Sequence, residues 1–125
     1  MMRKDKGIKR IKNSFKYAFN GLIDTYRTEQ SVWIYIPVAL LVILAGVFFK
    51  ISNYEWIAIV LVLGIILSLE LINTALEAVV DLVTNEYKPL AKKAKDTVSA
   101  AVLIFGITSV IVGLIIILPK FIALF

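Results

Sequence analysis

Polar side chains recur at helical spacing within one otherwise apolar segment of the chain. They are Glu70, Asn73, Glu77 and Asp81. Separations of 3, 4 and 4 residues place them on one face of an α-helix. Three carboxylates on one face repel one another unless a cation lies among them. The sequence offers two such cations: a hard divalent ion such as Mg²⁺, which prefers oxygen ligands, and the side chain of Lys95.

The absence of two residue types limits the chemistry available to this face. The chain contains no Cys and no His, which excludes disulfides, thiolate metal sites and Ser-His-Asp catalysis. It also lacks the GxxxxGK[ST] phosphate loop and the Gly-rich kinase loop, so the common soluble nucleotide-binding folds are excluded. Any reaction must therefore use carboxylates, Lys, Arg, hydroxyls or amides.

The composition is that of a membrane protein. Of the 125 residues, 60% are hydrophobic and 18% are charged, whereas a soluble domain averages about 45–50% apolar and about 25% charged residues. Long uncharged runs occupy 32–49, 56–69 and 97–118. Because a spanning helix needs about 20 residues, we extend the second run through Glu70. The sequence predicts an all-α membrane protein, a single membrane-embedded domain over 1–125, with spans at about 30–49, 55–83 and 96–119.

The basic residues set the expected orientation. Eight of the 14 Lys and Arg residues, Arg3 and Lys4 among them, precede the first run, and four more lie between the second and third runs. Basic segments stay in the cytoplasm. The N-terminus and a loop over 81–96 are therefore expected on the cytoplasmic side, with Lys50–Glu55 and the C-terminus outside.

An amphipathic helix is predicted before the first span, over about 7–28. Apolar side chains recur there at spacings of 3, 4, 4 and 3, at Ile8, Ile11, Phe15, Phe19 and Leu22. Lys and Arg occupy other positions of the same segment. Such a helix lies on an anionic membrane surface, here the cytoplasmic leaflet.

Glu70 is the acidic residue placed deepest in the membrane. It follows Trp56 by about 21 Å of helix, which places it in the cytoplasmic half of the hydrocarbon core. A carboxylate at this depth costs about 2.5–3.5 kcal/mol, and such a residue is a functional-site hypothesis by default. Glu29, at the start of the first span, is expected at the depth of Glu77. Topology therefore predicts a site at the cytoplasmic interface made of Glu29, Glu70, Asn73, Glu77, Lys95 and Asp96.

The residues alone leave several functions open. One is a phosphotransferase that acts on a membrane lipid, with Glu70 as general base. Another is a small oligomeric proton or ion pathway in which Glu70 is the relay carboxylate. A third is purely structural, with Glu70 in an inter-helix hydrogen bond or ion pair. Glu55 is expected to be a solvated charge of the outer loop, and Lys92 and Lys93 are expected to set topology only.

The polar face resembles a family motif, Glu-x-x-Asn-Ser/Thr-Ala/Ser-x-Glu-x-x-Val-Asp. Its fixed positions are met by Glu70, Asn73, Thr74, Ala75, Glu77, Val80 and Asp81. The motif is that of the small prokaryotic integral-membrane diacylglycerol kinases, which include the undecaprenol kinases of Gram-positive bacteria. Further likeness lies at 85–87, 94–96 and 99–102, and the resemblance covers about residues 8–120.

The resemblance implies a homotrimer in the bacterial cell membrane, with three spans and a surface helix per subunit and active sites shared between subunits. It implies transfer of the γ-phosphoryl group of Mg-ATP to a lipid hydroxyl. Glu70 would be the catalytic base, and Glu29 and Glu77 would hold Mg²⁺. The implied nucleotide site comprises Arg10, Tyr17, Glu29, Glu77, Glu86, Tyr87, Lys88, Lys95 and Asp96. The implied lipid site comprises Arg10, Glu70, Asn73 and Ser99.

Some points stay open at this level. Segments 89–96 and 113–120 are similar to the undecaprenol kinase branch, whereas 99–102 is more similar to the diacylglycerol branch, and we favour undecaprenol as the substrate. Arg10 and Tyr17 have simple leaflet contact as an alternative role. Asp81 is either a ligand or a structural partner.

Overall fold

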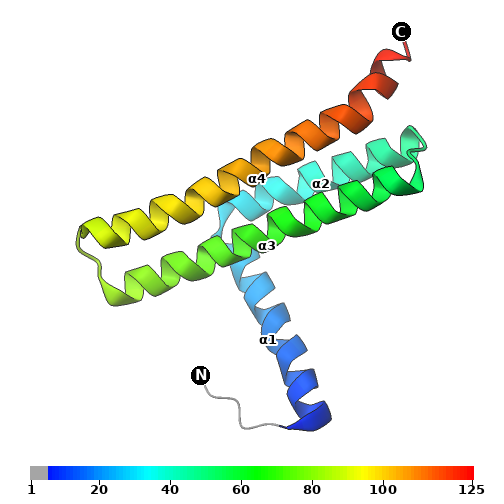
Figure 1. Cartoon of the computed structure of the whole chain (residues 1–125). Helices are drawn as coiled ribbons and strands as arrows, with labels where there is room; N and C mark the ends of the chain where they lie inside the picture. The colour runs from blue at the N-terminus through cyan, green and yellow to red at the C-terminus, as the bar shows by residue number, and fades with distance from the viewer. Residues whose placement is uncertain (1–5) are drawn as a thin grey trace.

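The computed structural model describes residues 6–125, so Arg3 and Lys4 of the basic set lie outside the described residues. The chain forms four helices, α1 (Gly7–Thr28), α2 (Gln30–Phe48), α3 (Asn53–Val83) and α4 (Pro89–Ile122) (Figure 1). No strand occurs within residues 6–125. The last three helices are long and apolar enough to cross a membrane. The predicted all-α membrane fold, with an amphipathic helix before three spans, is confirmed.

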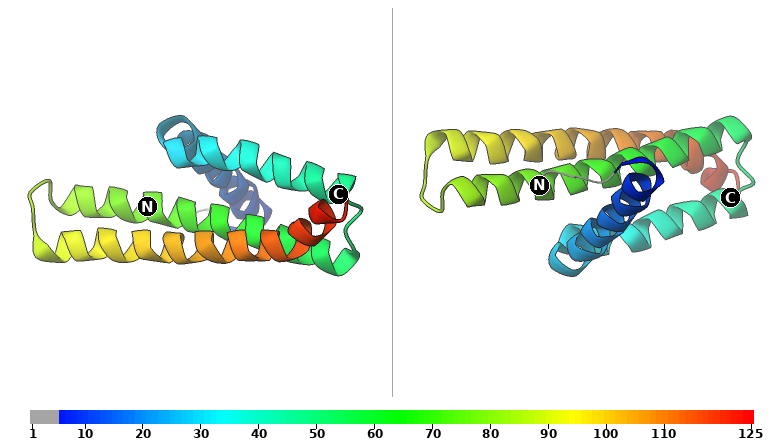
Figure 2. Two further views of the ribbon diagram at one scale, coloured as in Figure 1. Left: turned by 90° about the horizontal axis from the view of Figure 1, so that it is seen from above. Right: turned by 90° about the horizontal axis from the view of Figure 1, so that it is seen from below.

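The helices are arranged asymmetrically. α3 and α4 form a long antiparallel hairpin, while α2 lies beside only part of it, and α1 leaves the bundle at a steep angle (Figures 1 and 2). We call the end with the 84–88 turn the Tyr87 end and the end with the 49–52 turn the Lys50 end. Because α2 begins beside the middle of α3, the Tyr87 end consists of the hairpin alone.

The well-packed part of the molecule lies toward the Lys50 end. Ile51, Ile59 and Ile116 form a buried cluster there. Gly46 of α2 lies so close to α3 that a Cβ atom on it would come within 2.7 Å of the Trp56 ring. Most other large apolar side chains are exposed, as expected of surfaces that face lipid or other membrane helices.

A capping box begins α3 at the same end. The Ser52 hydroxyl accepts a hydrogen bond from the backbone N–H of Glu55 (3.2 Å), and the Glu55 carboxylate accepts one from the backbone N–H of Ser52 (2.9 Å). Lys120 Nζ lies 2.8 Å from Glu55 Oε2. The prediction that Glu55 is merely a solvated charge is wrong, because α4 continues past Pro119 and brings Lys120 to it.

The predicted loop over 81–96 is also mostly wrong. α3 ends at Val83, where the second span was expected to end, but α4 begins at Pro89, seven residues before the expected start of the third span at 96. Proline suits the first position of a helix, since its φ is already helical and its missing N–H is not needed there. The side chains of this segment that were expected in a loop therefore lie on helices: Asp81, Lys92, Lys95 and Asp96.

Candidate active site

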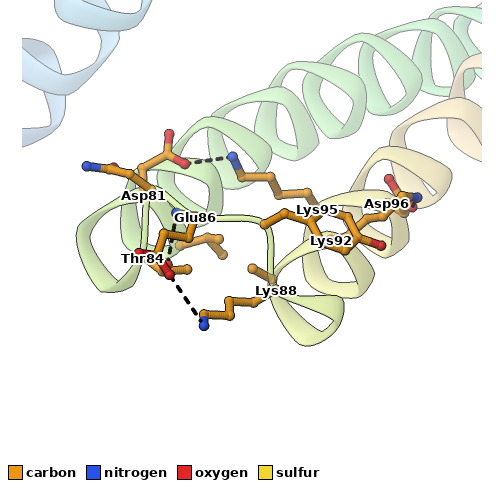
Figure 3. A pocket seen from close by; sticks show the side chains of 11 residues that line it. Asp81, Thr84, Glu86, Lys88, Lys92, Lys95 and Asp96 are labelled. Atoms are coloured by element: carbon orange, nitrogen blue, oxygen red, sulfur yellow. Dashed lines mark hydrogen bonds and ion pairs between the residues drawn. The ribbon is translucent and has the colours of Figure 1, made fainter.

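A polar cavity of about 340 Å³ lies at the Tyr87 end, between the last turns of α3 and the first turns of α4 (Figure 3). Its lining includes three lysines and three acidic residues. The lining residues are Val80, Asp81, Thr84, Asn85, Glu86, Tyr87, Lys88, Ala91, Lys92, Lys95 and Asp96. Sequence-predicted nucleotide residues at 86–88 and 95–96 are thus brought to one place by the hairpin.

One ion pair joins the two helices across this cavity. Lys95 Nζ lies 2.6 Å from Asp81 Oδ1 (Figure 3), and Lys95 is also near enough to Glu77 for electrostatic attraction. Lys95 is therefore a cation beside the acidic face of α3, one of the two candidates that the sequence offered. In this structure Asp81 is a partner of that lysine.

The other charges of the cavity pair locally. Lys92 pairs with Asp96 one turn along α4, and Lys88 Nζ lies 3.4 Å from Glu86 Oε2 (Figure 3). All four side chains are more than half exposed. Exposed pairs of this kind contribute little to stability, so these lysines can exchange their partners for an incoming anion at small cost.

Glu70 lies deeper along α3, where it meets the start of α2. The hydroxyl of Ser31 donates to Glu70 Oε2 at 3.1 Å. The side-chain oxygen of Asn73, one turn on, is buried and is the one buried side-chain polar atom without a hydrogen-bond partner within residues 6–125. An orphaned buried acceptor is costly unless a donor or a cation arrives. Within residues 6–125, Oε1 of Glu70 and the side-chain oxygen of Asn73 thus have no hydrogen-bond partner.

Glu29 lies nearer to the level of Glu70 than was expected. It ends α1 and precedes Ser31 by two residues. Since Ser31 contacts Glu70 and α2 runs antiparallel to α3, Glu29 lies at about the level of residue 72, short of Glu77 by about five residues, or ~7 Å along the axis. The expected common depth of Glu29 and Glu77 is therefore wrong, because the break between α1 and α2 falls opposite the middle of α3.

The carboxylates are suitable donors for Mg²⁺, although they do not form a closed cage. Within residues 6–125 no group of three or more acidic side chains is close enough to hold a metal ion. Mg²⁺ usually needs only one or two carboxylates, with phosphate oxygens and water completing its shell. Glu77, Glu29 and the orphaned oxygen of Asn73 are hard oxygen donors of the kind this ion prefers.

Seven predicted site residues do not line this cavity: Glu29, Glu70, Asn73 and Glu77, which are described above, and Arg10, Tyr17 and Ser99. Arg10 and Tyr17 lie on α1, which leaves the bundle, and neither lines the cavity. Ser99 is exposed on α4, one turn beyond Asp96, and also lies outside the lining.

An apolar groove of about 490 Å³ lies on the other side of Glu70, bounded by α2, α3 and α4. Its α3 lining includes Ile59, Val62, Leu63 and Ile66. Ile66 precedes Glu70 by one helical turn, so the lining continues the face that carries Glu70, Asn73 and Glu77. One face of α3 is thus apolar toward the Lys50 end and polar toward the Tyr87 end.

Sequence reasoning missed several residues of this region. Ser31 carried no signal, because a serine near a helix start is usually a cap, and its partner lies 39 residues away. Lys92 lines the cavity although it was expected only to set topology. Thr84 also lines it, and its hydroxyl accepts from the Glu86 backbone N–H at 3.1 Å. A Thr two residues before the turn apex was a detectable turn signal.

Comparison with known proteins gives consistent matches. Residues 16–117 match the sequence profile of a family described as prokaryotic diacylglycerol kinase. The chain is 42% identical over 113 residues to the undecaprenol kinase of Bacillus subtilis (strain 168), covering 90% of this chain and 92% of that protein. Identity to the diacylglycerol kinase of Synechocystis sp. is 37% over 112 residues, covering 89% and 64%. Identity to the diacylglycerol kinase of Escherichia coli (strain K12) is 30% over 105 residues, covering 84% and 86%.

Proposed function

Because the chain belongs to the prokaryotic diacylglycerol kinase family and is a phosphotransferase with an alcohol acceptor, we propose that it transfers the γ-phosphoryl group of ATP to the hydroxyl of a membrane lipid. We propose undecaprenol as the acceptor, since the undecaprenol kinase relative is more similar to the chain than the two diacylglycerol kinases compared above.

The observation that carries this proposal is that one face of α3 is apolar toward the Lys50 end and polar toward the Tyr87 end. The apolar groove ends one turn from Glu70, and the lysine-lined cavity begins beyond Glu77. A lipid with a long apolar tail and a single hydroxyl can enter along the groove and present the hydroxyl to Glu70. A polyphosphate can enter from the opposite end and meet the lysines. The reacting groups then approach each other along one helix.

The proposed reaction is an in-line displacement. Glu70 takes the proton of the lipid hydroxyl, the lipid oxygen forms a bond to the γ-phosphorus, and the bond between that phosphorus and the bridging oxygen of ADP breaks. ADP leaves with the electron pair of that bond. A positioned base contributes about 10²–10⁴-fold to such a transfer. Positioning and charge neutralisation supply most of the remainder.

The lysines of the cavity are proposed to neutralise the phosphates. Lys95 would turn from Asp81 toward the nucleotide, with Lys88 near it, while Glu86, Tyr87 and Asp96 line the nucleotide site. Support comes from the exposure of Lys88 and Lys95, each of which is paired with an exposed carboxylate. Exposed pairs are weakly held, so the lysines can turn to a phosphate.

Mg²⁺ is proposed as the accompanying ion. Glu77 and Glu29 would hold it, and it would neutralise charge on the transferred phosphoryl group. The unpartnered oxygen of Asn73 is proposed to accept a hydrogen bond from a group of the acceptor or to take part in the same shell.

We further propose a homotrimer with shared sites. Within one subunit α1 carries Arg10 and Tyr17 away from the cavity, and the Tyr87 end of the hairpin has no α2 beside it. A neighbouring subunit would cover this exposed surface and bring its own α1 residues to the nucleotide. Ser99, exposed on α4, would face the lipid in the same arrangement.

The Tyr87 end is proposed to face the cytoplasm of a bacterial cell, across whose plasma membrane the three spans run. The positive-inside rule supports this, because four lysines lie at that end, whereas only Lys50 and Lys120 lie at the other end. These four are Lys88, Lys92, Lys93 and Lys95. The same side supplies ATP.

The test is phosphate transfer by pure protein in mixed micelles. Labelled ATP and Mg²⁺ are offered with undecaprenol or with diacylglycerol, and the lipid fraction is counted. We expect label in both lipids, with the larger kcat/KM for undecaprenol. A larger kcat/KM for diacylglycerol would identify diacylglycerol, and not undecaprenol, as the preferred acceptor. No label in either lipid would refute the proposed kinase activity. Flux of protons or cations in liposomes without ATP would instead indicate the ion pathway.

A further inference from the structure

The hydroxyl of Ser31 makes a contact that no sequence motif indicates. It lies in the first turn of α2 and donates to Glu70 Oε2 at 3.1 Å, across 39 residues of chain. The hydroxyl of Ser68, two residues before Glu70 on α3, donates to the backbone carbonyl of Gly64. The neighbouring hydroxyl of Thr74 bonds only to the backbone carbonyl of Glu70.

The backbone of Ser31 is held by its neighbours in the chain, while its side chain is exposed. The chain is extended at Glu29, which ends α1 and begins α2 (φ −108°, ψ 117°). Val32, the next residue after Ser31, is 2% exposed, and it anchors the first turn of α2 in the bundle. A hydroxyl on an anchored turn is preorganised for the one carboxylate that it faces.

The hydrogen bond makes the two oxygens of the Glu70 carboxylate different from each other. Oε2 is occupied by Ser31, while Oε1 has no hydrogen-bond partner in the described part of the chain. A bond to one oxygen restricts rotation about the last torsion of the glutamate, which is otherwise broad. The free oxygen is therefore held in one direction.

We propose that Ser31 is a positioning residue for the reaction, which directs Oε1 of Glu70 toward the hydroxyl of the acceptor lipid. This inference rests on the proposed kinase function. Ser31 keeps its own proton throughout; the proton of the acceptor passes to Oε1, and the bond from Ser31 steadies the carboxylate before and after the transfer. Charge-assisted hydrogen bonds of this kind are the stronger ones in proteins.

The experiment compares three variants in the micelle assay. Ser31→Ala removes the hydroxyl, and Ser31→Thr keeps it. Ser68→Ala is the matched control, because Ser68 lies two residues from Glu70 but its hydroxyl bonds only to the carbonyl of Gly64. We expect Ser31→Ala to lower kcat about 10-fold, in the range for a hydrogen bond to a charged group. The KM for ATP should stay within about twofold, and Ser31→Thr and Ser68→Ala should retain most activity.

Other outcomes separate this inference from the function on which it rests. Wild-type kcat in Ser31→Ala would overturn the positioning role and leave the kinase intact. An equal fall in Ser31→Ala and Ser31→Thr, or a parallel rise in the KM for ATP, would indicate a general disturbance of the turn and would also overturn it. A wild-type protein that phosphorylates neither lipid would refute the proposed function itself.

Discussion

Two ion pairs join α3 to α4, one at each end of the hairpin, and they differ in their surroundings. At the Lys50 end, Lys120 meets Glu55, whose carboxylate also closes the capping box of α3. At the Tyr87 end, Lys95 meets Asp81 in an open cavity. The side chains of the first pair are about 30% exposed, and those of the second are 41% and 58% exposed.

The different surroundings of the two ion pairs indicate that one pair stabilises the fold and the other is available to a ligand. Around the first pair lie the buried isoleucines and the close contact of Gly46 with Trp56, so the pair belongs to a packed region. Around the second lie other exposed charges that have only local partners. A charge whose present partner is weakly held is available to a ligand. We therefore expect variants at the Lys50 end to change stability and variants at the Tyr87 end to change activity.

The largest effect is expected at Glu70. Glu70→Gln keeps the shape of the side chain but removes the base, and we expect turnover to fall about 10²–10⁴-fold. Labelled phosphate in the lipid fraction measures it. The matched change at the other end, Glu55→Gln, should leave turnover within about twofold. Equal losses in the two variants would show that the comparison between the ends is wrong.

The next effect is expected at Lys95. Lys95→Ala removes a cation that is proposed to meet the phosphates, and we expect kcat/KM for ATP to fall about 10–100-fold, as for loss of a hydrogen bond between charged groups. Steady-state kinetics at varied ATP concentration measures this. The unfolding midpoint should change little, because the pair with Asp81 is exposed. A fall in stability with unchanged kinetics would assign Lys95 to structure.

A stability effect of moderate size is expected at Gly46. In Gly46→Ala the new methyl would lie 2.7 Å from the Trp56 ring, so a side chain must move, at a cost of about 1–3 kcal/mol. Unfolding in mixed micelles with increasing denaturing detergent measures it. Gly64→Ala is the control, since a Cβ there meets nothing within 4 Å and Ala favours a helix. Equal destabilisation of both would contradict close packing at the Lys50 end.

The smallest effect is expected at Lys120. Lys120→Ala removes the partner of Glu55 and should lower the unfolding midpoint by a few degrees, while kcat and the KM for ATP remain those of the wild type. Thermal unfolding and the micelle assay on the same preparation test both statements. Loss of activity without loss of stability would place Lys120 in the functional site.

The helices and the common face of the acidic residues could be predicted from the sequence, because both depend on local periodicity. The spacing of Glu70, Asn73 and Glu77 predicts their common face, and the apolar runs predict the three long helices that the structure shows. These patterns depend only on the geometry of a helix. Lys95 was also identified as one cation for that face.

The errors have two physical origins. The charged residues of segment 89–96 led us to predict a loop there. However, its Ala and Lys residues are strong helix formers, and Pro89 suits the first position of a helix. The partners of Glu55 and Ser31 are 65 and 39 residues away, and no local pattern carries such contacts.

The most direct test of the central claim is equilibrium binding of ATP to the pure protein in micelles, without an acceptor lipid. Wild type, Lys95→Ala and Lys120→Ala are titrated with a fluorescent ATP analogue. The account predicts that Lys95→Ala weakens binding about 10-fold or more, and that Lys120→Ala binds as the wild type does. Unchanged binding in Lys95→Ala, or equal weakening in both variants, would contradict the assignment of the nucleotide to the Tyr87 end.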